Sequence, residues 1–155
     1  MDARVQKAPA ATARGAAVLL IGVALAAWIV FGRFLFGIGG ELTLAYSLIG
    51  VFVVALHVFI GRALARTAAR GFTTRASTRG TLMAAWGCGI LLGLTIPDLT
   101  RGGLHTILSG DTEPGLGVAI GVANPAGIVM IALTIIALVL ATQDSRGPWP
   151  AEEEL

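Results

Sequence analysis

Four stretches of apolar residues, separated by short polar segments, dominate the pattern along the chain. They cover residues of about 16–36, 42–61, 79–96 and 117–141. A helix rises about 1.5 Å per residue and the hydrocarbon core of a bilayer is about 30 Å thick, so roughly 20 apolar residues suffice to cross it. The pattern therefore predicts an all-α integral membrane protein, in which residues 16–142 form a bundle of four transmembrane helices in the lipid bilayer.

The first stretch follows a basic segment, residues 1–15, and a secretory signal peptide would begin in the same way. The uncharged run from Ala16 to Gly32 is longer than the roughly 7–15 residues of a signal-peptide core. We therefore expect a membrane span here rather than a cleaved signal.

The last stretch is long enough to allow two interpretations. Residues 115–141 would form a helix of roughly 40 Å, longer than a bilayer core requires. Asn124 and Pro125 supply a point at which it could break, with Asn124 as the N-cap, Pro125 as the first helical residue and residues 115–123 as a re-entrant or interfacial piece. The alternative, which we favour, is one continuous helix that kinks at Pro125.

The distribution of charge predicts the orientation. The segment between the second and third stretches contains five arginines and no acidic residue: Arg62, Arg66, Arg70, Arg75 and Arg79. Basic loops stay on the cytoplasmic side, and the basic residues 1–15 then fall on that side too. Both termini are thus expected in the cytoplasm, and the loop with Asp98, Asp111 and Glu113 outside. The acidic tail, residues 143–155, is expected to be disordered.

Composition agrees with a membrane protein. Apolar residues make up 55% of the chain and charged residues 13%, against about 45–50% and 25% in soluble domains. The single cysteine, Cys88, excludes an intrachain disulfide framework and a cysteine zinc site. Ten arginines against one lysine suggest a GC-rich bacterial genome, and hence a multi-pass protein of the bacterial cytoplasmic membrane.

His57 is the first candidate for chemistry, because ionisable residues inside a bilayer usually have a partner or a purpose. It lies within about a turn of the predicted end of the second span. It shares one helix face, expected to point into the bundle, with Thr43, Ser47, Gly50, Val54 and Gly61. A proton relay or cation ligand is one interpretation. A buried histidine bonded to a backbone carbonyl or a hydroxyl is the interpretation we favour.

Arg33 lies near the outer end of the first span. It could reach the lipid headgroups, or pair with Glu41 or Asp98 and so tie this span to the second or third. Binding of a substrate by Arg33 is the less favoured alternative.

The five loop arginines recur at spacings of four, with Gly71 between the two groups. They serve as the topology signal, and they could also bind anionic lipids or an acidic partner at the cytoplasmic face. Nucleic-acid binding is not expected, since Phe72 is the one aromatic residue in this segment. Pairs of glycines four residues apart, Gly89 with Gly93 and Gly117 with Gly121, indicate close helix packing within the bundle or in a homo-oligomer.

An enzyme is the least favoured function, and its only basis is the polar group of the outer loop: Asp98, His105, Asp111 and Glu113. The sequence contains no HExxH or GxSxG motif and no glycine-rich phosphate loop with lysine. The polar residues of the outer loop, His105 among them, match no metal-ligand spacing, so no metal and no cofactor are expected. We expect a non-enzymatic accessory or scaffold subunit of a membrane complex, with a membrane-protein partner. A small oligomeric transporter or channel, using His57, Asn124 and Pro125, is the alternative.

Overall fold

The computed structural model describes residues 3–147, with side chains from residue 13 onward, and 75% of the protein is helical. The predicted all-α class is confirmed. The elements in chain order are α1 (Ala3–Phe31), a 3-10 helix η1 (Gly32–Phe36), α2 (Thr43–Ala69), α3 (Ala76–Thr95), β1 (Asp98–Thr100), β2 (Gly103–His105) and α4 (Gly115–Asp144). The two short strands pair antiparallel, with Asp98 opposite His105.

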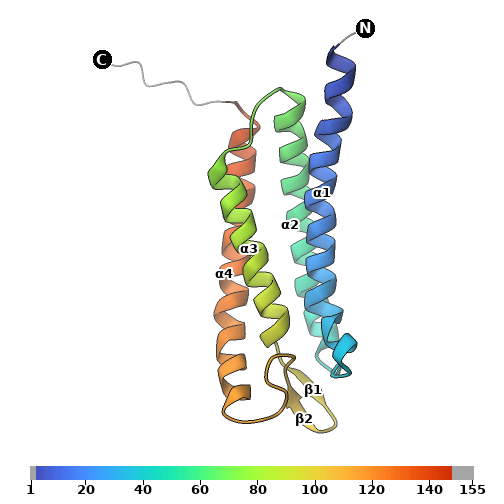
Figure 1. Ribbon diagram of the computed structural model, residues 1–155, viewed down its shortest axis with the longest axis vertical. Coiled ribbons are helices and arrows are strands. Elements are labelled where there is room, and N and C mark those ends of the chain that lie inside the picture. Colours follow the sequence, from blue (N-terminus) through green and yellow to red (C-terminus); the bar gives the residue numbers. More distant parts are fainter. Residues whose placement is uncertain (1–2, 148–155) are drawn as a thin grey trace, which may run out of the picture.

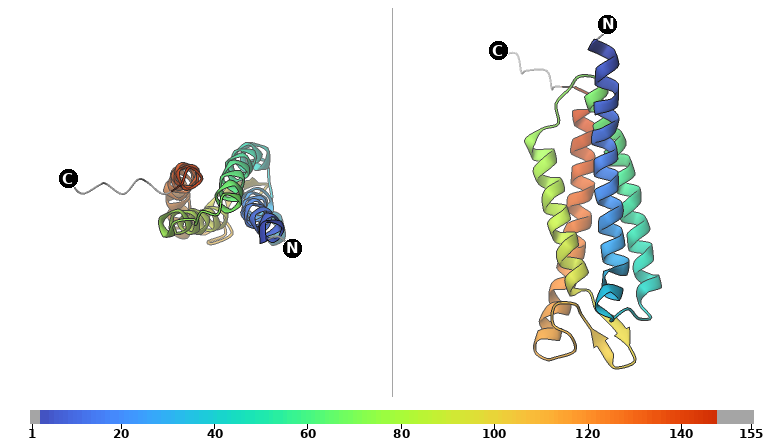
Figure 2. Two further views of the ribbon diagram at one scale, coloured as in Figure 1. Left: turned by 90° about the horizontal axis from the view of Figure 1, so that it is seen from above. Right: turned by 45° about the vertical axis from the view of Figure 1, so that its right-hand side comes forward.

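The four long helices lie side by side as two pairs (Figure 1). In one pair α1 packs along α2, and in the other α3 packs along α4; the pairs meet where α2 contacts α4 and α1 contacts α3 (Figure 2). One end of the bundle carries η1 and the β-hairpin, and we call it the hairpin end. The opposite end carries the α2–α3 connection and the last turn of α4, and we call it the basic end.

Three helices within the described residues are long and apolar enough to cross a membrane, which indicates a multi-pass membrane protein. They are residues 13–36, Thr43–Ala69 and Gly115–Asp144. Helix α3 does not reach the same apolarity over 18 residues, because its first turn contains Ser77, Thr78 and Arg79.

Several element boundaries differ from the prediction. Helix α2 continues to Ala69, two turns past the predicted residue 61, because Ala63, Leu64 and Thr67 are buried against the rest of the bundle. The predicted tail begins too early, since Gln143 and Asp144 belong to α4. Residues 148–155 of that tail lie outside the described part of the chain.

Helix α4 is continuous from Gly115 to Asp144, with Pro125 inside it. This agrees with the continuous-helix interpretation, and residues 115–123 are its first turns rather than a separate re-entrant piece. The end of the first predicted span also differs from the prediction. Its last five residues form the 3-10 helix η1, which ends at Gly37, where φ is 71°.

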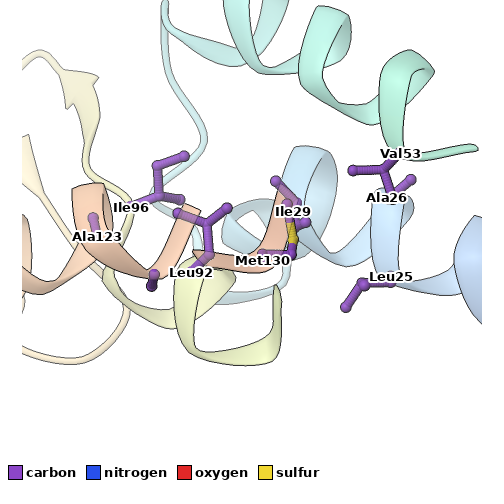
Figure 3. Close-up of a cluster of buried hydrophobic side chains, with 9 residues drawn as sticks. Leu25, Ala26, Ile29, Val53, Leu92, Ile96, Ala123 and Met130 are labelled. Carbon is purple, nitrogen blue, oxygen red and sulfur yellow. The ribbon is translucent and has the colours of Figure 1, made fainter. Parts of the chain in front are cut away.

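The core is formed by small and branched side chains that all four helices contribute. One cluster, toward the hairpin end, comprises Leu25, Ala26, Ile29, Val53, Leu92, Ile96, Ala123, Ala126 and Met130 (Figure 3). A second, toward the basic end, comprises Ile60, Ala63, Leu64, Leu82, Ala137 and Ala141. Glycines beside these clusters allow the helices to approach closely.

Two glycine contacts set the separation of the helices. A Cβ atom on Gly15 would lie 2.6 Å from the carbonyl oxygen of Gly61, so α1 and α2 touch backbone to backbone. Gly89 packs against Leu25, where a Cβ atom would lie 2.8 Å from a methyl group. The predicted packing role therefore holds for this glycine, whereas Gly121 on α4 has nothing within 4 Å of its Cβ position and faces outward.

Candidate functional site

A fully buried ion pair, Arg33 with Asp98, lies at the hairpin end. The Arg33 Nε atom is 3.3 Å from Oδ2 of Asp98, and both side chains are 0% exposed. Arg33 also donates from Nη2 to the Val30 carbonyl at 3.0 Å. Its guanidinium lies 4.3 Å from the ring centroid of Tyr46, a cation–π contact. Of the two partners that the sequence offered to Arg33, Asp98 is the one it contacts.

Asp98 organises the chain around it through backbone hydrogen bonds. Its carboxylate accepts N–H groups from Gly40 at 2.9 Å, Leu42 at 2.9 Å and Leu99 at 2.8 Å. Because the first N–H groups of a helix lack partners within it, the carboxylate stabilises the approach to α2. Gly40 must be a glycine, since a Cβ atom there would collide with the carbonyl of Leu99.

The charges of Arg33 and Asp98 offset each other inside the protein. The Tyr46 hydroxyl extends the same network by donating to the Pro97 carbonyl at 2.7 Å. This arrangement ties η1, the start of α2 and the end of α3 together. A pair that neutralises itself and is closed to solvent is suited to structural support rather than to holding a charged substrate.

His57 occupies the middle of α2 and not the last turn, because the helix continues well beyond the predicted end. It is fully buried. Its Nδ1 atom is 2.8 Å from the Val53 carbonyl, and its Nε2 atom is 3.1 Å from the indole nitrogen of Trp86. A carbonyl accepts and an indole N–H donates, so the bonding pattern assigns the proton to Nδ1 and a neutral imidazole.

Both ring nitrogens of His57 are thus occupied, and the Trp86 bond ties α2 to α3. A second tryptophan, Trp28, donates to the Ile90 carbonyl at 3.2 Å and ties α1 to α3. Gly22 leaves the space that the His57 ring fills, since any side chain at position 22 would overlap it. None of the six residues on the predicted face of α2 is exposed, so this face does point into the bundle.

Asn124 and Pro125 lie on an exposed part of α4. Asn124 lines a cavity of about 310 Å³ between α2, α3 and α4, together with Tyr46 and Leu92. Within the described residues no hydrogen bond involves the Asn124 amide. The structure does not bring Asn124 together with His57, because His57 faces α1 and α3.

All five loop arginines are exposed, but two of them bind the end of α4. Arg75 pairs with the buried carboxylate of Asp144, which also accepts the Thr78 hydroxyl at 2.7 Å. Arg70 donates to the Ser145 carbonyl at 2.7 Å. Sequence reasoning missed Asp144, because it assigned this residue to the tail. The sequence did contain a signal: Asp144 closely follows an apolar stretch, on the same predicted side of the membrane as the basic loop.

The other three loop arginines, Arg62, Arg66 and Arg79, have no acidic partner within 4 Å among the described residues. In the outer loop, His105 pairs with Asp111 at 3.5 Å. Asp98 lies opposite His105 in the hairpin, but its buried carboxylate contacts Arg33 and backbone N–H groups instead. Across residues 13–147 no three histidine, cysteine or acidic side chains gather as metal ligands would.

No protein-family model matches the chain, and no curated protein or solved structure matches it. Its function is therefore argued from the residues and their geometry. Among the described residues, the side chains of Asn124 on α4 and of Arg62, Arg66 and Arg79 toward the basic end have no hydrogen-bond or ion-pair partner.

Proposed function

We propose that this protein is a non-enzymatic accessory or scaffold subunit of a complex in the bacterial cytoplasmic membrane. It crosses the membrane four times, with both termini in the cytoplasm, and it binds a helix of a partner protein along α4. One observation carries this proposal: the Asn124 amide is exposed on an apolar helix without a hydrogen-bond partner among the described residues.

The surroundings of Asn124 fit a helix contact. Exposed residues recur at helical spacing along the same face of α4: Gly117, Gly121, Asn124, Ile128, Ala132 and Ile135. Asn124 is nine residues from the start of α4, or about 14 Å along the axis. In hydrocarbon an amide is unfavourable without a partner, and an interhelical hydrogen bond contributes roughly 0.6–2 kcal/mol. The two glycines allow a second helix to approach closely.

The contacts of the buried ionisable groups favour a role other than transport. His57, Arg33 and Asp98 are the buried ionisable groups of the inner bundle, and each is bonded to a neighbouring element of the same chain. A transport pathway needs polar groups that can exchange partners with water or cargo. The interaction surface is therefore the outside of the bundle.

The arrangement of α3 supports the fourth crossing. It packs along α4 and connects the basic end to the hairpin end (Figure 1). Its lower apolarity comes from its first turn, where arginine and threonine side chains can reach the headgroups. The basic loop before α3 favours the cytoplasmic side for that end.

The test is affinity purification of the tagged protein from its own host in mild detergent, with mass spectrometry of the bound proteins and the mass of the complex. We expect a stoichiometric partner. The Asn124→Leu and Gly121→Leu variants should each lose it. Gly87→Leu is the matched control, because Gly87 is equally open but lies on α3, and it should keep the partner.

Recovery of the protein alone, or equal loss of the partner in all three variants, would contradict the proposal. A homo-oligomer that depends on Asn124 would favour the second candidate, an oligomeric transporter or channel. The observation that supports this second candidate is the cavity between α2, α3 and α4, whose mostly apolar lining includes the polar residues Asn124 and Tyr46.

A further inference from the structure

A groove between α1 and α3 opens at the basic end, and it has a polar part and an apolar part. We call it the α1–α3 groove; its volume is about 560 Å³. Its lining residues are Arg14, Ala17, Val18, Leu64, Thr73, Thr74, Arg79, Leu82, Met83 and Trp86. They come from α1, α2, the α2–α3 connection and α3.

The lining follows from helical spacing. On α3, Arg79, Leu82, Met83 and Trp86 share one face, so the positive charge is followed by about 10 Å of apolar wall. On α1, Arg14 is followed by Ala17 and Val18 on the same face. Two guanidinium groups and two threonines thus lie at one end of the groove, and the apolar side chains continue from them toward the bundle.

The charges of the groove are not neutralised from within the described chain. Neither Arg14 nor Arg79 has an acidic partner within 4 Å among the described residues. The nearby buried acid, Asp144, is already engaged by Arg75 and Thr78. The groove therefore contains two cations that no described acidic side chain neutralises.

We propose that the α1–α3 groove binds an anionic phospholipid, whose phosphate pairs with Arg14 and Arg79 and whose acyl chain lies against Met83 and Trp86. Arginine matches phosphate geometry through paired N–H donors. A small anion would leave the apolar wall uncovered, and an uncharged chain would leave both arginines without a partner. A lipid with a charged headgroup satisfies both parts of the groove at once.

Trp86 gives the groove a fixed inner end. Its indole N–H is bonded to His57 at 3.1 Å, which holds the ring in place between α2 and α3. A lipid chain packed on this ring would contact α1 and α3 together, the two helices that meet across the pairs of the bundle. The proposal rests on the membrane location within the proposed function but not on the partner at Asn124.

The test uses the full-length protein in nanodiscs that contain equal amounts of phosphatidylglycerol and phosphatidylcholine. Lipids that stay bound after release into detergent are counted by native mass spectrometry. We expect phosphatidylglycerol to be enriched about 10-fold over phosphatidylcholine in the bound lipid. Arg14→Gln with Arg79→Gln should abolish the enrichment. Arg62→Gln with Arg66→Gln removes the same charge from exposed residues outside the groove and should retain it.

A further variant tests the part of the groove proposed to bind the acyl chain, without changing the two arginines. Ala17→Phe keeps both arginines but fills the groove, and it should also lower the bound phosphatidylglycerol. Circular dichroism of each variant checks that the helices are intact. Equal loss of enrichment in the two double variants, or no enrichment in the unaltered protein, would overturn the lipid site. Displacement of the lipid by excess inorganic phosphate would overturn it in favour of a free-anion site. Failure to enter nanodiscs at all would instead contradict the membrane location.

Discussion

Arg33 and Asp98 differ from most charged residues of this chain, because neither side chain is exposed to solvent or lipid headgroups. Only other groups of the protein can stabilise these two charges. Both side chains are fully buried. The two partners are not equally supported. Besides its ion pair with Arg33, the Asp98 carboxylate accepts hydrogen bonds from three backbone N–H groups, whereas the Arg33 guanidinium has one carbonyl acceptor and the Tyr46 ring. Removing one partner should therefore have a different effect from removing the other.

Asp98→Asn should lower the free energy of unfolding by about 3–5 kcal/mol, because it leaves a buried guanidinium without a counter-charge. Arg33→Met should have a smaller effect, since the carboxylate keeps its three backbone donors. The measurement is equilibrium unfolding in mixed detergent micelles. Asp111→Asn is the control: its carboxylate is 61% exposed, and we expect a change within about 0.5 kcal/mol. A larger loss for Arg33→Met than for Asp98→Asn would contradict this interpretation.

At this scale the sequence predicted that His57 is buried and that Arg33 could pair with Glu41 or Asp98, but it could not identify the other groups around them. Asp98 was one of two predicted partners of Arg33. Glu41 follows the first predicted span and Asp98 follows the third, so both acids were expected on the same side of the membrane as Arg33. Trp86 could not be matched to His57, since 29 residues separate them and only the packing of α3 on α2 brings them together. Periodicity predicts which face of a helix is buried, but not which residue of another helix it meets.

Among the elements, α1 and α2 form the tightest contact of the bundle. Gly15 and Gly61 each point at the other's backbone, and a Cβ atom on either would lie within 2.7 Å of a carbonyl oxygen. Such a contact cannot relax by rotating a side chain. Close approach through small residues is a common way for helices to associate in membranes, where the hydrophobic effect between helices is absent.

Gly15→Ala should therefore destabilise the protein by about 1–3 kcal/mol, as expected for overpacking. Gly87→Ala introduces the same methyl group into open space on α3. It should leave stability unchanged or slightly raised, because alanine favours a helix over glycine by up to about 1 kcal/mol. Thermal unfolding in detergent, followed by circular dichroism, measures both. Equal effects of the two substitutions would show that Gly15 is not held against α2.

The bounds of the four long helices were harder to predict than their number. The arginines at spacings of four from Arg62 were a sign that α2 continues past residue 61, yet their charge masked the buried residues between them, such as Leu64 and Thr67. The β-hairpin was not predicted, since its strands have three residues each and carry no alternating pattern. Pro125 lies within a helix because neighbouring residues on α4, Ala123 and Ala126, are buried in the core.

On the scale of the whole molecule, the two ends of the bundle differ in chemistry. The basic end holds the α2–α3 connection with its arginines, and the hairpin end holds the exposed acids Asp111 and Glu113. Because helices that are consecutive in the chain are antiparallel, the fold places residues distant in sequence at the same end. The proposed orientation puts the α2–α3 connection and the proposed lipid site on the cytoplasmic side, and the proposed fourth crossing puts the two ends of α3 on opposite sides of the membrane.

The orientation can be tested with single cysteines in a Cys88→Ser background. Ser77→Cys and Ala13→Cys lie at exposed positions toward the basic end, and Thr112→Cys lies at an exposed position in the loop before α4. In intact spheroplasts a membrane-impermeant maleimide should label Thr112→Cys alone, and it should label the other two only after lysis. The background variant, without cysteine, controls for other reactions.

Labelling of Ser77→Cys and Thr112→Cys from the same side would show that α3 does not cross, because these two positions lie toward its opposite ends. If the reagent labelled Ser77→Cys in intact spheroplasts and Thr112→Cys only after lysis, the four crossings would stand but the protein would have the inverted orientation. The arginine-rich loop would then require another explanation than the positive-inside rule.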